Sequence, residues 1–146
     1  MIATEPAPSR NRHRVLCVDD NELSGFVNAT ILRNEGYEVW TCSDPLQATS
    51  IAKSEELDLA ILDYEMPKMN GAELAAFCKA ANPDIKVILF SGSLNIPTCQ
   101  LALADQFVEK SAGIEVLLMA IDALLTNSNT RLKWVSRIES KHQNTE

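Results

Sequence analysis

Five short apolar runs alternate with helical patterns along most of the chain, and this alternation constrains the fold more than any other feature of the sequence. The segments between the runs repeat apolar residues every three to four positions, as amphipathic helices do. A strand–helix repeat of this kind buries a parallel sheet between two helical layers. The sequence therefore predicts an α/β fold with five parallel strands, at residues 14–18, 37–42, 57–63, 85–91 and 105–110.

The helical segments carry their own start and stop signals. Gly36 is placed to end the first of them, and Pro83 stops the third. Asp44 is placed to cap the second segment, with Pro45 at its first helical position. The apolar faces of the first and the last segments are made by Leu23, Phe26, Val27, Thr30 and Ile31, and by Ile114, Leu117, Leu118, Ile121 and Leu125.

Length and hydropathy indicate one domain. The 146 residues suffice for a single core, no apolar run approaches the length of a membrane span, and the N-terminus has no signal-peptide pattern. We expect a cytoplasmic protein without a membrane partner. Residues 1–13 are expected to form a flexible arm, residues 14–126 the domain, and residues 127–146 a tail with a short amphipathic helical pattern.

Charge and cysteine usage exclude further classes. Residues 15–126 carry 6 basic and 17 acidic residues, whereas both ends of the chain are weakly basic. Such an acidic body argues against nucleic-acid binding. The four cysteines form no C-x-x-C pair and are expected to be free thiols, and the two histidines lie in the polar ends, which disfavours a zinc site.

Polar side chains follow four of the five predicted strands. Asp19 and Asp20 come after the first strand, Asp63 after the third, Ser91 ends the fourth and Lys110 ends the fifth. Ligands of doubly wound folds bind beyond the carboxyl ends of the strands. If these four strands are neighbours, three carboxylates, one hydroxyl and one ammonium converge on a single edge of the sheet.

Each of these side chains also has an ordinary structural alternative. Asp20 or Asn21 could cap a helix, and Asp63 could form a turn at the end of its strand. Ser91 could be a turn residue, and Lys110 could be a surface lysine. If all these alternatives held, five such residues would lie at four neighbouring strand ends by coincidence. We therefore favour a functional site.

The adjacent aspartates indicate a bound cation. Two carboxylates about 4 Å apart repel by roughly 4 kcal/mol at an effective dielectric constant near 20, and a single lysine under-compensates three of them. The candidate ligands are all oxygen, which suits Mg²⁺ better than Zn²⁺. A hard cation beside a lysine and a hydroxyl fits a phosphoryl group, and a carboxylate can accept that group as an acyl phosphate.

At these residues the sequence resembles the receiver domain of bacterial two-component response regulators, over about residues 14–126. "VDDNE" is similar to the acidic pair of that family, and "LDYEMPKMNG" to its phosphoacceptor loop, in which the aspartate is followed by Met-Pro and a Gly. Ser91 stands where the family has Thr or Ser, Lys110 where it has its invariant lysine, and Phe107 at its aromatic switch position. The resemblance implies a flavodoxin-like (βα)5 three-layer sandwich with strand order 2-1-3-4-5.

The resemblance also implies a role for each site residue. Asp63 would accept the phosphoryl group from a sensor histidine kinase or a histidine phosphotransfer protein. Mg²⁺ would be bound by Asp20, Asp63 and the backbone carbonyl of Glu65, with Asp19 acting mainly through a metal-bound water. Lys110 and Ser91 would contact phosphoryl oxygens, and Phe107 would follow Ser91 inward to switch the face that binds an unidentified downstream protein.

The sequence departs from the family pattern in three places. Ser111 stands where the family usually has Pro, so we expect no cis peptide bond after Lys110. Gly92 replaces the usual Ala and should loosen its loop. Only 18 residues separate Ser91 from Lys110, and Pro97 confines the fourth helix to a short segment near "TCQLALA". This helix belongs to the output face of the family, so the resemblance implies less about the output partner than about phosphorylation.

The sequence offers two other functions. A haloacid dehalogenase-type phosphatase needs an aspartate two residues after its nucleophile, whereas Glu65 stands there, and the chain has no room for a cap domain. A phosphorylation-independent receiver-like interaction module would keep the fold, but such modules generally lose part of the acidic cluster. We therefore expect a stand-alone receiver, a monomer or weak dimer that acts as a switch and not as an enzyme.

Overall fold

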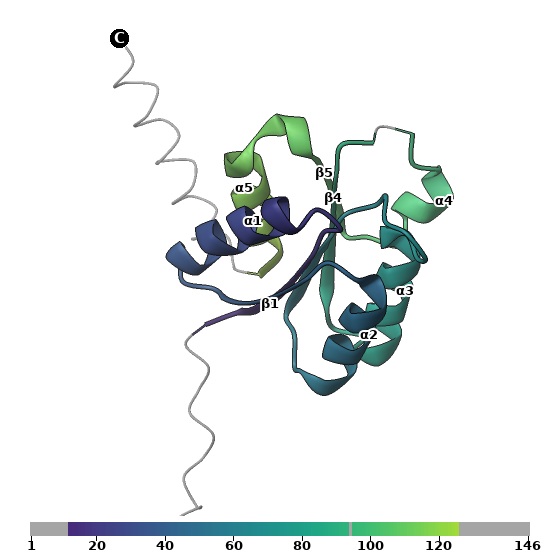
Figure 1. The fold of residues 1–146 in the computed structure, drawn as a ribbon, viewed down its shortest axis with the longest axis horizontal. Coiled ribbons are helices and arrows are strands. Elements are labelled where there is room, and N and C mark those ends of the chain that lie inside the picture. The colour runs from purple at the N-terminus through teal and green to yellow at the C-terminus, as the bar shows by residue number, and fades with distance from the viewer. Residues whose placement is uncertain (1–11, 94, 126–146) are drawn as a thin grey trace, which may run out of the picture.

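The computed structural model describes residues 12–93 and 95–125, and its centre is a single five-stranded parallel sheet (Figure 1). The strands lie in the order β2-β1-β3-β4-β5, which confirms the predicted doubly wound fold. Their register is that of neighbouring parallel strands throughout, for example Val18 opposite Leu62 and Leu62 opposite Leu89. The strands are β1 (Arg14–Val18), β2 (Glu38–Cys42), β3 (Leu59–Leu62), β4 (Lys86–Ser91) and β5 (Gln106–Glu109).

Helices cover both faces of the sheet, with α1 and α5 on one side and α2 and α3 on the other (Figure 1). Each strand therefore sends alternate residues into one of two cores: Val15 and Cys17 pack towards α1 and α5, Leu16 and Val18 towards α2 and α3. The helices are α1 (Glu22–Asn34), α2 (Pro45–Ser54), α3 (Gly71–Ala81), α4 (Thr98–Leu101) and α5 (Ile114–Leu125), with the 3-10 turn η1 (Lys110–Ala112) before α5.

The predicted apolar face of α1 is mostly not the buried one, since of its five residues only Ile31 packs against the core. Leu23, Phe26 and Val27 are exposed, at 72%, 64% and 44% of their surface, and Thr30 is exposed as well. The buried residues are Gly25, Ala29 and Leu32, a second stripe at helical spacing. Small residues bring the helix backbone close to the sheet, and a Cβ at Gly25 would lie 3.9 Å from the Cβ of Asp19. The bulky residues consequently point outward, beside the carboxyl edge of the sheet.

The other helices agree with their sequence signals. Asp44 caps α2 by accepting a hydrogen bond from the Leu46 amide, and Pro45 is the first helical residue. The predicted face of α5 is the packed one, because Leu117, Leu118 and Ile121 are buried. Cys17, Cys42, Cys78 and Cys99 are free, as expected.

The segment from β4 to β5 is short, as Pro97 predicted. α4 is a single four-residue turn whose N-cap, Pro97, makes no side-chain hydrogen bond. Beyond α4, Asp105 anchors the chain to the sheet by accepting hydrogen bonds of 2.8 Å from the Val87 amide and from Lys79 Nζ. Although burial opposes ionisation of Asp105, these bonds hold its pKa below the ordinary value.

Two further expectations concern the backbone and the chain ends. Within the described residues there is no cis peptide bond, so Lys110 continues into η1 through a trans bond. In the same part of the chain no helix is long and apolar enough to cross a membrane. The predicted tail (127–146) and all but the last two residues of the predicted arm (1–13) lie outside the described residues.

Candidate functional site

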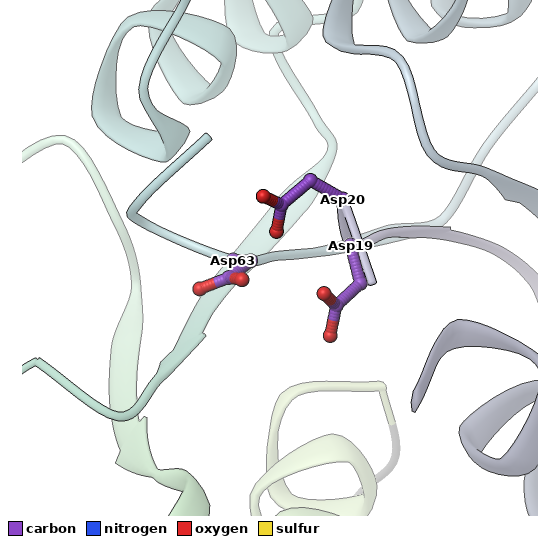
Figure 2. A group of neighbouring side chains, drawn as sticks. All are labelled: Asp19, Asp20 and Asp63. Atoms are coloured by element: carbon purple, nitrogen blue, oxygen red, sulfur yellow. The ribbon is translucent and has the colours of Figure 1, made fainter. Parts of the chain in front are cut away.

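Three aspartates lie together where β1 and β3 end, and we call Asp19, Asp20 and Asp63 the acid site (Figure 2). One carboxylate oxygen from each lies within 4.8 Å of the others. Asp19 and Asp63 are buried, at 5% and 8% exposure, whereas Asp20 is exposed. Neither acid of the pair caps α1, because Asn21 does so by accepting a hydrogen bond from the Ser24 amide. The helix-cap alternative for Asp20 is therefore wrong.

Main-chain hydrogen bonds hold the acid site in place. The amide of Asp63 donates to the carbonyl of Val18, at 2.9 Å, and the amide of Asp19 donates to the carbonyl of Cys42, at 3.2 Å. Asp19 is also held through its side chain, because its Oδ1 accepts a hydrogen bond of 2.9 Å from the Asn21 amide. The backbones of both buried aspartates are thus tied to the ends of neighbouring strands.

Gly71 allows the loop after Asp63 to close tightly. We call residues 63–70 the acceptor loop. A Cβ at Gly71 would lie 2.3 Å from the carbonyl oxygen of Asp63, a contact that no side chain can make. The Gly71 amide donates to the carbonyl of Tyr64, at 2.9 Å, so the loop is pinned at both ends. The glycine of "LDYEMPKMNG" is therefore required by a close approach of two backbone segments.

Lys110 reaches the acid site from the end of β5. Its Nζ donates to Asp19 Oδ2 at 2.8 Å and to Asp63 Oδ2 at 3.4 Å. Burial disfavours the ammonium charge, but the hydrogen bond to Asp19 and the charge of Asp63 outweigh it and raise the pKa of Lys110 above its ordinary value. The lysine is therefore charged, and it neutralises one of three carboxylates.

The remaining negative charge is reflected in the pKa of Asp63. Burial raises that pKa to about 6; Lys110 opposes the shift, and the charges of Asp19 and Asp20 add to it. A further cation at the acid site would relieve this repulsion. The donors fit Mg²⁺, since all are carboxylate oxygens, the ligand type that this hard cation prefers.

The other predicted site residues lie around this group. Glu65 follows Asp63 by two positions in the acceptor loop, and the use of its carbonyl as a metal ligand stays a prediction. Ser91 is buried at the end of β4, and its Oγ accepts a hydrogen bond of 3.1 Å from the Ser93 amide. Phe107 is half-buried in β5 and packs against the core that faces α2 and α3.

Two features of the site were missed by sequence reasoning. One is a hollow of about 350 Å³ beside the acid site, lined by Leu23, Val27, Phe90 and Lys110 among others. The small-residue stripe of α1 was the signal that its bulky residues face outward and can line such a hollow. The other is a hydrogen bond from the hydroxyl of Tyr64 to Gln100 of α4, for which the sequence holds no signal.

Comparison with known proteins agrees with this geometry. The family model for the response regulator receiver domain matches residues 15–122 of this chain. The structure of the response regulator TrrA from Thermotoga maritima in complex with Mg²⁺-BeF is similar, at 32% identity and a TM-score of 0.73 over 77% of this chain and 99% of that one. A structure of the histidine kinase ThkA in complex with TrrA matches at 31% identity, with a TM-score of 0.68 over 78% of this chain and 99% of that one.

Curated relatives are longer than this chain. The sensor kinase/phosphatase CqsS of Vibrio cholerae is 30% identical over 121 residues, which are 79% of this chain and 18% of CqsS. The probable transcriptional regulatory protein TcrX of Mycobacterium tuberculosis is 28% identical over 114 residues, 76% of this chain and 49% of TcrX. The chain thus spans half or less of these two relatives.

Proposed function

The chain belongs to the response-regulator receiver family, and on that premise we propose that it accepts a phosphoryl group on Asp63 in a Mg²⁺-dependent reaction. The observation that carries the proposal is the convergence of Asp19, Asp20, Asp63 and Lys110 at one edge of the sheet. Three carboxylates with one ammonium leave a net negative pocket, which attracts a cation before it can accept an anionic phosphoryl group. The domain is a signalling module, so the phosphoryl group serves as a signal carried on the chain itself.

In the proposed reaction a carboxylate oxygen of Asp63 attacks the phosphorus of a phosphohistidine. The phosphorus–nitrogen bond breaks, its electron pair stays on the imidazole, and the imidazole takes up a proton from solvent. The product is an acyl phosphate on Asp63. Asp63 suits this role because its main-chain amide is anchored to Val18, which fixes the backbone from which the carboxylate extends.

The neighbouring side chains would divide the remaining work. Asp19, Asp20, Asp63 and the carbonyl of Glu65 would hold Mg²⁺, which neutralises phosphoryl charge when it is bound. The ammonium of Lys110 lies 3.4 Å from Asp63 and is placed to exchange a carboxylate partner for a phosphoryl oxygen.

Ser91 and Phe107 would report the new phosphoryl group. The Ser91 hydroxyl lies at the end of β4, next to the acceptor strand β3, and would hydrogen-bond a phosphoryl oxygen. Phe107, half-buried in β5, would move with it. Such a change biases an equilibrium between two conformations and alters the surface seen by a downstream protein.

The phosphodonor would be a sensor histidine kinase or a histidine phosphotransfer protein. Support comes from the exposed apolar residues Leu23, Phe26 and Val27, which flank the acid site and offer a contact surface. The solved complex of ThkA with TrrA, a relative at 31% identity, has a kinase and a regulator as its members. In this proposal the chain acts in the cytoplasm as a receiver, a monomer or weak dimer.

One observation favours the second candidate function, a phosphorylation-independent interaction module. α4 is only four residues long and has no buried residue, so the usual output face is reduced. The two functions differ in their response to Mg²⁺. Titration of the chain with Mg²⁺ should raise its thermal midpoint if the acid site is a working metal site, and should leave it unchanged in a degenerate module.

Intact-mass analysis after incubation with acetyl phosphate tests the proposed function directly. The native chain should gain one phosphoryl group, only when Mg²⁺ is present. Asp63→Asn should gain none, and Asp58→Asn, which alters a carboxylate before β3 at the opposite edge, should behave as the native chain does. An adduct that persists in Asp63→Asn, or a native chain that binds no Mg²⁺ and forms no adduct, would contradict the proposal.

A further inference from the structure

Tyr64 joins the acceptor loop to two helices. Its carbonyl accepts a hydrogen bond of 2.9 Å from the amide of Gly71, the first residue of α3. Its hydroxyl donates to Oε1 of Gln100 in α4. We propose that this Tyr64–Gln100 hydrogen bond is the link through which occupation of the acid site repositions α4, with Tyr64 as a positioning residue of the acceptor loop. The inference rests on the proposed function, because it assigns a route to the signal that starts at Asp63.

α4 has little else to hold it. The helix is a single turn, its N-cap Pro97 offers no side-chain hydrogen bond, and none of its residues is buried. Leu101 is half-buried and packs against the core that faces α2 and α3, but apolar packing of this kind is not directional. A hydrogen bond weakens steeply when its angle or distance changes, so the Gln100 bond is the directional contact between the turn and the acceptor loop.

The starting point of the link is one residue from the reacting carboxylate. Tyr64 lies between Asp63, the proposed acceptor, and Glu65, whose carbonyl is a proposed metal ligand. A phosphoryl group on Asp63 and a cation at the acid site would both pull on this stretch of backbone. The hydrogen bond from Gly71 holds the Tyr64 carbonyl in place. A shift of the backbone at Asp63 would therefore reorient the Tyr64 side chain, and its hydroxyl would carry Gln100 with it.

This route does not pass through Ser91 or Phe107, the two residues that report the phosphoryl group in the proposed function. The hydroxyl of Ser91 accepts a hydrogen bond from Ser93, and Phe107 reaches the same core cluster as Leu101 through packing. The Tyr64 route needs neither residue. By reciprocity, a link that carries an effect from the acid site to α4 must also let α4 affect ligand affinity at the acid site.

Hydrogen exchange on the 146-residue chain, followed by mass spectrometry, measures the link. The readouts are the amides of residues 98–104, first without ligand and then with Mg²⁺ and beryllofluoride as the phosphoryl mimic. In the native chain the ligands should change exchange in this segment. In Tyr64→Phe we expect exchange of these amides without ligand to rise about two- to tenfold, which is the range for one net hydrogen bond. The ligand-induced change should shrink, and the Mg²⁺ affinity should fall by a similar factor.

Matched variants separate the link from a general loss of structure. Gln100→Met removes the acceptor and should reproduce Tyr64→Phe, whereas Gln100→Glu keeps an acceptor and should restore the native response. The double variant Tyr64→Phe/Gln100→Met should be no worse than either single variant, because the same bond is lost in all three. Tyr37→Phe removes the hydroxyl of the second tyrosine, outside the site, and should leave the α4 response unchanged.

The outcomes are distinct. A native-like α4 response in Tyr64→Phe, or additive effects of the two single variants, would overturn the inference and leave the proposed function intact. A native chain with no response to Mg²⁺ and beryllofluoride anywhere would overturn the proposed function and the inference with it. A reduced α4 response in Tyr64→Phe and in Gln100→Met, together with a native-like α4 response in Gln100→Glu, would establish the link.

Discussion

The acid site and α4 both follow strands at the carboxyl edge of the sheet, yet they are held in opposite ways. Asp19 and Asp63 are buried and are bound through their main chains to neighbouring strands. α4 is a single turn without a buried residue or a capping side chain. Phosphoryl chemistry needs oxygen atoms at constant positions, whereas a reporter must change position at a small free-energy cost. In the proposed function the molecule thus separates an immobile reaction centre from a loosely anchored reporter.

The largest expected effect comes from packing at the immobile centre. In Gly71→Ala the new Cβ would meet the Asp63 carbonyl oxygen at 2.3 Å, and neither backbone can yield without moving the acceptor loop. We expect the free energy of unfolding to fall by about 3 kcal/mol and Mg²⁺ affinity to fall with it. Urea denaturation and Mg²⁺ titration measure both quantities.

Gly92→Ala is the matched control for this change. A Cβ at Gly92 meets no atom within 4 Å, so we expect a change of no more than about 0.5 kcal/mol. Equal destabilisation by the two alanine variants would show that the close approach at Gly71 is not what positions Asp63.

The second effect concerns the single ammonium of the centre. Lys110→Met leaves Asp19 buried without the partner that now lies 2.8 Å away, and we expect a loss of about 1 to 3 kcal/mol in metal-free buffer. Mg²⁺ should then bind more tightly, because the competing cation is gone. Lys79→Met, which breaks the 2.8 Å pair with Asp105, should leave Mg²⁺ affinity unchanged.

The third effect is a pH dependence. Because the pKa of Asp63 is raised to about 6 in the folded chain, the native state binds a proton that the unfolded state releases near pH 4. Ionised Asp63 therefore destabilises the fold above pH 6, and the penalty disappears as the pH falls to about 4. Asp63→Asn should stabilise the metal-free chain by about 1 to 2 kcal/mol at pH 7, after allowance for solvent screening.

Urea denaturation of the native chain and of Asp63→Asn, in EDTA between pH 4 and pH 8, checks this dependence. The difference between the two chains should shrink steadily towards pH 4. A difference that is the same at every pH would mean that Asp63 titrates normally and that the acid site holds no excess charge. With Mg²⁺ present the native chain should instead be more stable than Asp63→Asn, since the cation binds the site only when all three carboxylates are present.

The smallest expected change in the free energy of unfolding is in α4, the proposed reporter. Leu101→Ala in α4 should lower the free energy of unfolding by less than about 1 kcal/mol, because the side chain is only half-buried. Leu74→Ala in α3, at a site that is fully buried, should lower it by about 2 to 5 kcal/mol. Comparable losses in thermal or urea melts would show that α4 is part of the rigid body.

Most of the fold and much of the site followed from the sequence. The strand–helix alternation predicted the sheet, and the placement of Asp19, Asp20, Asp63 and Lys110 at strand ends predicted which side chains meet, because parallel strands end at a common edge. This reasoning needs only the order of elements and the period of the strands.

Two features did not follow, for different physical reasons. The face of α1 that is buried is the one that lets the helix approach the sheet most closely. The small residues Gly25 and Ala29 lie on that face, and the bulkier Phe26 and Val27 are exposed. The Tyr64–Gln100 bond depends on where the loop after β4 carries α4. Hydropathy describes transfer from water and contains neither backbone approach distances nor loop paths.

The outward face of α1 has a consequence for how such a protein diversifies. Since Leu23, Phe26 and Val27 carry little of the packing, changes at these positions leave the fold almost untouched while altering the contour beside the acid site. Gly25, Ala29 and Leu32, on the opposite stripe, leave no such freedom. In the proposed function, substitutions at these outward positions would therefore change which partner binds without destabilising the fold.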